Sequence, residues 1–148
     1  MKRALRIGCG ALAAACGLFA ADASAQSYEL RPIADAFSQW TRSTGAHNYD
    51  CVDEEGAHDG EGSYVFGKTP YITDSYELEN LPAGVTGIEK VRLYVVARKT
   101  HPAHTQLELG IRSGKTESWR SGQVLATSYA TYGGEGAEWT VDPATQAP

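Results

Sequence analysis

The sequence predicts an all-β protein, an antiparallel β-sandwich or barrel, from three observations. Apolar and polar residues alternate with period two over 88–99 and 106–113. Clusters of Gly, Pro, Ser and Asn separate other short segments of strand-like composition. No segment after residue 25 carries an apolar stripe of helical period over ten residues. Alternation indicates strands with one face in the core, and short, regularly spaced strands with turn signals are typical of sandwiches and barrels.

The first 25 residues predict a cleavable export signal. Lys2, Arg3 and Arg6 supply positive charge, residues 7–21 form an uncharged apolar stretch, and Ala23-Ser24-Ala25 is a small-x-small cleavage site. The apolar stretch is shorter than the ~20 residues that span a bilayer. Two alternatives are an uncleaved anchor and lipidation at Cys16. We expect a secreted, periplasmic or cell-surface protein with a single domain over 26–148, free of the membrane once the signal is cleaved.

Charge and cysteine content restrict the partners of that domain. The 148-residue chain has a net charge of -5, and loss of three basic residues and one acidic residue with the signal leaves -7. An acidic surface disfavours nucleic acid and anionic membranes, which need clustered Lys and Arg. Cys51 is the only cysteine after residue 25. The domain therefore enters an oxidising compartment without an internal disulfide, and Cys51 is expected to pack as a small buried hydrophobe.

The strands can be placed in order along the chain. The clearest is 88–99, where Val91, Leu93, Val95 and Ala97 share the inner face. It is expected to pair with 106–113 as an antiparallel hairpin across the turn-like segment 100–105. Shorter strands are predicted at 37–42, 48–52, 62–66, 76–79, 123–127 and 137–141. Turns are predicted at 43–45, 56–60, 81–84, 112–115 and 133–136.

An acidic loop is a candidate calcium site. Asp53, Glu55, Asp59 and Glu61 are interleaved with glycines. Calcium prefers several carboxylate and carbonyl oxygens on a flexible loop, and exported proteins encounter this ion. The spacing does not match an EF-hand. The alternative interpretation is a solvated acidic turn, which is the usual state of such charge clusters.

Three aromatic residues are candidate glycan-binding groups: Trp119, Tyr132 and Trp139. Exposed rings can stack on sugars, and Trp119 lies among polar neighbours. The alternative is that the rings belong to the core or protect a sheet edge, as large aromatics usually do, and this alternative is favoured for Trp139. No hydrolase, metalloprotease or nucleotide-binding motif is present, and no two carboxylates stand out as a glycosidase pair. We therefore expect no enzymatic activity.

A series of motifs resembles a known family. In chain order they are Tyr49-Asp50-Cys51-Val52-Asp53-Glu54, 59–65, Leu81-Pro82, 88–99, 111–114, 128–132 and Asp142-Pro143-Ala144-Thr145. Over about 35–146 the chain is similar to small jelly-roll-type β-sandwich proteins found among tailed-phage structural genes and in bacterial genomes. The resemblance implies an antiparallel β-sandwich of jelly-roll type, a virion-associated or surface structural role, and no cofactor.

Two departures modify what the resemblance implies. Members of that family usually lack an export signal, and they tend to continue past residue 148 with at least one more strand. We expect either a truncated chain or a closing strand supplied by a neighbour. The sequence thus predicts an exported, non-catalytic structural or interaction domain that self-associates or joins a larger virion-like assembly. A secreted carbohydrate-binding module is the first alternative, and a small glycan hydrolase is the second.

Overall fold

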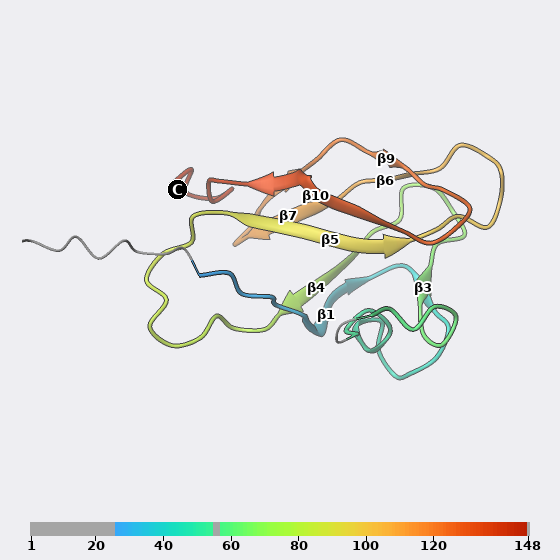
Figure 1. Cartoon of the computed structure of the whole chain (residues 1–148), viewed down its shortest axis with the longest axis horizontal. Helices are drawn as coiled ribbons and strands as arrows, with labels where there is room; N and C mark the ends of the chain where they lie inside the picture. Colours follow the sequence, from blue (N-terminus) through green and yellow to red (C-terminus); the bar gives the residue numbers. More distant parts are fainter. Residues whose placement is uncertain (1–25, 55–56, 148) are drawn as a thin grey trace, which may run out of the picture.

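The computed structural model describes residues 26–54 and 57–147, which form short strands joined by loops (Figure 1). The predicted export signal and Glu55 lie outside the described residues. The elements are β1 (Pro32–Ser38), β2 (Thr41–Arg42), the 3-10 helix η1 (Tyr49–Cys51), β3 (Val65–Phe66), β4 (Asp74–Leu78), β5 (Val91–Ala97), β6 (Gln106–Leu107), β7 (Gly110–Ser113), β8 (Thr116–Trp119), β9 (Gln123–Val124) and β10 (Ala130–Trp139). The described part contains no α-helix, so the all-β prediction is confirmed at this level. Within it, no helix has the length and apolar character needed to cross a bilayer.

All strand pairing in the described residues is antiparallel and two-stranded. The pairs are β1–β4, β2–β3, β5–β10, β6–β9 and β7–β8. Strands before residue 80 pair with one another, and strands after residue 90 do the same. Figure 1 shows the β1–β4 pair and the β6–β9 pair on opposite sides of β5. The chain therefore contains an amino-terminal group (β1 to β4 with η1) and a carboxy-terminal group (β5 to β10).

The predicted alternation is confirmed in β5. Exposure alternates residue by residue from Val91 to Ala97, with Tyr94 and Val96 on the solvent side. Leu93 and Val95, on the other face, pack on the core cluster of Leu109, Ala137 and Trp139. This burial removes apolar surface from water and is the main favourable contribution to folding.

The pairing partner predicted for this strand was wrong. β5 pairs with β10, whereas 110–113 pairs with β8. The predicted turn at 112–115 does form, because Gly114 adopts a positive φ of 57° between β7 and β8. The 112–115 turn folds 110–113 back onto β8, its nearest neighbour along the chain. β10 lies farther along the chain, and alternation alone cannot identify it as the partner of β5.

Several other segments also differ from their predicted structure. The predicted strand 37–42 is interrupted at 39–40 and the predicted strand 106–113 at 108–109, and β8 lies where no strand was predicted. Residues 49–51 form η1 instead of a strand, since the backbone N–H groups of Cys51 and Val52 bond within the segment. A run of five residues is too short for alternation to distinguish the two structures. The glycine-rich stretch 133–136 was predicted as a turn, but it lies inside β10. There the pairing with β5 shifts in register, because Gly133 pairs with Tyr94 and the next paired residue, Glu138, pairs with Arg92.

The core is small compared with the apolar surface left exposed. In the described residues, the buried hydrophobic side chains are Cys51, Leu109, Leu125, Ala137 and Trp139. Large hydrophobic side chains that remain exposed are Tyr28, Ile33, Phe37, Tyr71, Leu78, Ile88, Tyr94, Val96, Trp119, Val124 and Val141. Single exposed apolar residues are ordinary, but so many on a domain of this size indicate surfaces available for contacts.

Candidate functional site

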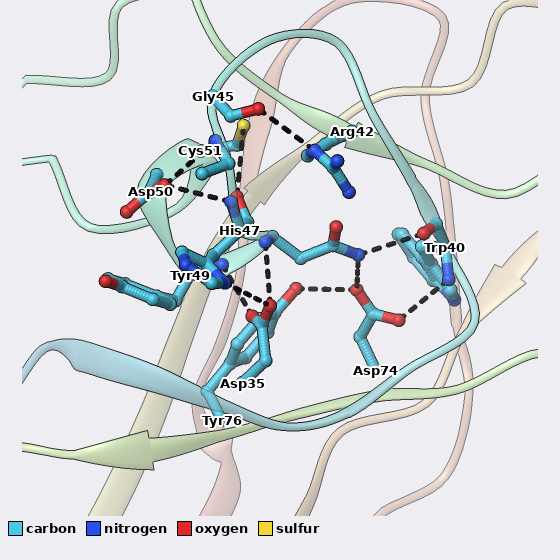
Figure 2. A network of polar contacts seen from close by, with 12 residues as sticks. Asp35, Trp40, Arg42, Gly45, His47, Tyr49, Asp50, Cys51, Asp74 and Tyr76 are labelled. Atoms are coloured by element: carbon cyan, nitrogen blue, oxygen red, sulfur yellow. Dashed lines mark hydrogen bonds and ion pairs between the residues drawn. The ribbon is translucent and has the colours of Figure 1, made fainter.

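A polar network centres on Asp74, the first residue of β4 (Figure 2). Its Oδ1 accepts hydrogen bonds from the backbone N–H groups of Gln39 (2.7 Å) and Trp40 (2.8 Å). Its Oδ2 accepts from Asn48 Nδ2 (2.7 Å) and from the Tyr76 hydroxyl (2.9 Å). Because a carboxylate has about four acceptor positions, these bonds fill its capacity. Asp74 therefore connects β4, the end of β1 and the loop before η1.

A second carboxylate, Asp35 on β1, fixes the start of η1. It accepts hydrogen bonds from the backbone N–H groups of Asn48 (2.9 Å) and Tyr49 (2.7 Å). Such N–H groups have no partner inside a helical turn and need one outside it. The His47 Nδ1 atom lies 3.9 Å from Asp35 Oδ2, and its ring stacks on Tyr49. In the same loop, Asp50 accepts from the backbone N–H groups of Ala46 and His47.

This network is suited to holding the fold together. Burial, followed by the hydrogen bond to Asp74, raises the pKa of the Tyr76 hydroxyl far above its usual range, so it remains a proton donor. The negative charge of Asp50 is the main cause of a raised pKa at Tyr49. Asp35, Asp50 and Asp74 each accept hydrogen bonds from donors of the chain itself, and these bonds restrain the loop around η1 and the strands next to it. Sequence analysis missed it, because Asp35 and Asn48 lie in no recognisable motif.

The acidic loop is attached to the carboxy-terminal group. Glu61 Oε1 pairs with Arg98 Nη2 at 2.5 Å and accepts from the Tyr129 hydroxyl at 3.1 Å. The single proton of this hydroxyl is shared with the Gly60 carbonyl, whose oxygen lies 2.9 Å from the hydroxyl oxygen, and the Arg98 guanidinium lies over the Tyr129 ring. The loop thus joins two groups that share no sheet.

The candidate calcium ligands in the described residues do not form one group, and Asp59 and Glu61 have different hydrogen-bond partners. Asp59 accepts from the Ser63 hydroxyl (2.8 Å), whereas Glu61 is engaged by Arg98 and Tyr129. Asp53 is exposed, and Glu55 lies outside the described residues. Among residues 26–54 and 57–147, no group of three or more His, Cys, Asp or Glu side chains has metal-binding geometry. The calcium site remains a prediction.

The candidate glycan-binding rings occupy different environments. Trp139 is 3% exposed, donates its indole N–H to Ser118 Oγ (3.0 Å) and has the Arg120 guanidinium over its ring. Tyr132 is half-buried, and its hydroxyl accepts from the backbone N–H of Ala126. Trp119 is 45% exposed on β8. Of the three, Trp119 is the ring that a ligand could reach directly.

A small cleft lies beside Trp139. Its volume is about 210 Å³, and it is lined by Thr116, Glu117, Ser118, Arg120, Trp139, Val141, Pro143 and Gln146. Arg120 donates from Nε and Nη2 to the Glu138 carbonyl, which holds the guanidinium against the ring. The turn at the rim is organised by Asp142, which accepts from the backbone N–H groups of Ala144 and Thr145. Arg120 therefore covers one face of the Trp139 ring.

Comparisons with protein-family profiles, with curated proteins and with solved structures found no match for this chain. What the molecule does must therefore be inferred from its own residues and their geometry.

Proposed function

We propose that this chain is an exported, non-catalytic structural domain of the antiparallel β-sandwich, jelly-roll type, which functions by associating with copies of itself or with a larger surface assembly. A sandwich needs two strand layers with a shared core. Leu93 and Val95 of β5, with Ala137 and Trp139 of β10, pack with Leu107, Leu109 and Ile111 around β6 and β7. These contacts support two facing layers.

The observation that carries the proposal is the amount of apolar surface left in solvent. Tyr94 is 62% exposed and Val96 40%, both on the outer face of β5. The solvent-facing side of an antiparallel sheet normally carries polar residues. Burial of such side chains in an interface would recover free energy that the small core does not supply.

The neighbouring charges are compatible with a docking face. Arg92, on the same face, is paired with Glu138 (2.5 Å) and lies 3.8 Å from Glu135. The hydrogen bond from Arg92 is the main cause of a lowered pKa at Glu138. A polar rim of paired charges beside an apolar centre is typical of protein interfaces. The outer face of β5 is thus the association surface in this proposal.

Solution mass tests the proposal. The full chain would be expressed with its own leader, purified after export, and measured by light scattering over a wide concentration range. We expect a multimer, and we expect the double variant Tyr94→Ser/Val96→Ser to shift the mass toward that of a monomer. Val124→Ser, which changes an exposed apolar side chain on β9, is the matched control and should leave the mass unchanged. A wild-type chain that stays monomeric and does not bind its producing cell surface would overturn the proposal.

A further inference from the structure

The outer face of the β7–β8 hairpin groups one aromatic ring with two charged side chains. In the hairpin register, Gly110 lies opposite Trp119, and Arg112 lies opposite Glu117. Alternation places these residues on one face, whereas Ile111 and Ser118 point to the other, where Ile111 packs on the core and Ser118 bonds Trp139. The outer face therefore presents Trp119 next to a cross-strand pair of opposite charge, and Arg112, Glu117 and Trp119 are all exposed.

The Trp119 ring is held against the sheet. A Cβ atom placed on Gly110 would lie 2.6 Å from ring atom Cε3 and 2.7 Å from Cδ2, so the indole covers the space that any other residue would fill. The indole N–H donates to Glu117 Oε2 at 3.2 Å. These two constraints fix the ring while leaving it 45% exposed. An exposed ring fixed in this way loses little conformational entropy when a ligand binds.

We propose that this face is a saccharide-binding platform, with Trp119 stacking on one sugar ring and with Arg112 and Glu117 bonding its hydroxyl groups. The C–H face of a pyranose is apolar and slightly positive, which matches the negative face of an indole. Its hydroxyls require both donors and acceptors, which a guanidinium and a carboxylate supply.

The polar surroundings favour a sugar over a protein partner. A protein hot spot needs a ring of neighbouring contacts that excludes water from its centre. Trp119 instead has exposed polar neighbours on its own face, whereas the outer face of β5 offers adjacent apolar side chains. The saccharide platform lies on β7 and β8, whereas the association surface lies on β5. A negative result for one of these surfaces therefore leaves the proposal for the other intact.

Affinity electrophoresis through gels containing soluble β-glucan, xylan, mannan or solubilised peptidoglycan tests the platform with the full exported chain. We expect at least one polysaccharide to retard the wild type. Trp119→Ala should weaken that retardation about two- to tenfold, the scale of one lost aromatic contact. Trp119→Phe should keep part of it. Tyr71→Ala removes an exposed ring that lies outside both the β7–β8 face and the outer face of β5, and this variant should match the wild type.

Two further variants separate binding from folding. Gly110→Ala should weaken retention by displacing the ring, and Arg112→Gln should weaken it without touching the ring contact. Near-ultraviolet circular dichroism identifies any variant that has lost its fold, and the exposed Arg112 position keeps the test valid if Gly110→Ala does not fold. Absence of retardation on all four polysaccharides would overturn the proposal. So would unchanged retention in Trp119→Ala, or a Trp119→Ala variant that alters solution mass instead of retention, which would indicate a protein contact.

Discussion

Asn48 shows how one buried polar side chain can determine a local structure. It is 2% exposed, and its Nδ2 group donates both to Asp74 Oδ2 and to the Trp40 carbonyl at 2.9 Å. Its backbone N–H also bonds to Asp35. A buried amide with its donors satisfied stabilises a single conformation, while removal of the side chain leaves its partners without a bond.

We predict that Asn48→Ala lowers the free energy of unfolding by about 2 kcal/mol, because two acceptors lose their donor. Urea denaturation would measure the change. Asn80→Ala is the matched control, because Asn80 is exposed outside the network, and should change stability by less than about 0.5 kcal/mol. Equal effects of the two substitutions would show that the network does not contribute to stability.

A second prediction concerns Asp142. The hydrogen bond from the Ser113 hydroxyl (2.6 Å) is the main cause of its lowered pKa, followed by the backbone N–H of Thr145. A carboxyl with a lowered pKa in the folded state stabilises that state above its unfolded pKa, and this contribution is lost as the pH falls through the folded value. The affected range therefore lies below about pH 4.

Ser113→Ala should raise the pKa of Asp142 toward its ordinary value. It should reduce stability at neutral pH more than at a pH low enough to protonate the carboxyl in both states. Carboxyl-carbon NMR titration measures the pKa directly. Ser121→Ala, at an exposed serine, should leave it unchanged. An unaltered Asp142 titration in Ser113→Ala would assign the shift to the remaining donors, which are the backbone N–H groups of Ala144 and Thr145 and the Thr145 hydroxyl.

At the scale of elements, β10 depends on one glycine. Gly133 has a φ of 101°, and a Cβ atom there would collide with the Leu93 carbonyl of β5. The irregularity between Gly133 and Glu138 bends the strand where its pairing changes register. Only glycine meets both requirements without strain.

Gly133→Ala should therefore cost about 2 kcal/mol or more in unfolding free energy, from the strained backbone and the clash combined. Thermal or urea denaturation would detect it. Gly87→Ala is a suitable comparison, since that position has open space around it and no positive φ, and the change should be nearly neutral. A neutral Gly133→Ala would mean that β10 pairs in another register.

Elements could be predicted from the sequence where the alternation of apolar and polar residues was long and placed the apolar side chains on one face. Val91 to Ala97 could be assigned because its inner side chains are all apolar, and the 112–115 turn because Gly114 marks it. The partner of β5 and the 3-10 helix η1 could not be assigned, because they depend on contacts between distant residues such as Asp35 and Tyr49. The two-residue strands β2, β3, β6 and β9 lie within longer segments that were predicted as strands. Trp119 was identified among the candidate rings. The packing of its indole ring over Gly110 could not be predicted, because it depends on the pairing register of β7 with β8.

For the whole molecule, the described strands of the two groups share no sheet, and the acidic loop provides contacts between them. Tyr129 is central, since its hydroxyl bonds to Gly60 and Glu61 and its ring contacts both Arg98 and His58. Such a connection can be weakened without removing either set of strand pairs.

We predict that Tyr129→Phe accelerates cleavage of the acidic loop by a glutamate-specific protease several-fold, because Gly60 and Glu61 lose the hydroxyl donor that they share and the loop opens locally. The melting temperature should fall by only a few degrees. Tyr28→Phe, at an exposed tyrosine outside the loop, is the control and should be cleaved like the wild type. Unchanged proteolysis in Tyr129→Phe would show that Arg98 alone retains the loop.

The buried thiol of Cys51 has a consequence for kinetics. Its Sγ donates to the Thr44 carbonyl at 3.3 Å, and it is the only cysteine of the described residues. A thiol reagent can therefore reach it only when the loop around η1 opens, so its labelling rate in dilute urea reports the opening equilibrium of the amino-terminal group. Amide hydrogen exchange in β5 reports the other group. Because the two groups share no sheet, labelling of Cys51 should become fast at urea concentrations where the β5 amides are still protected, and the chain would then unfold in two steps.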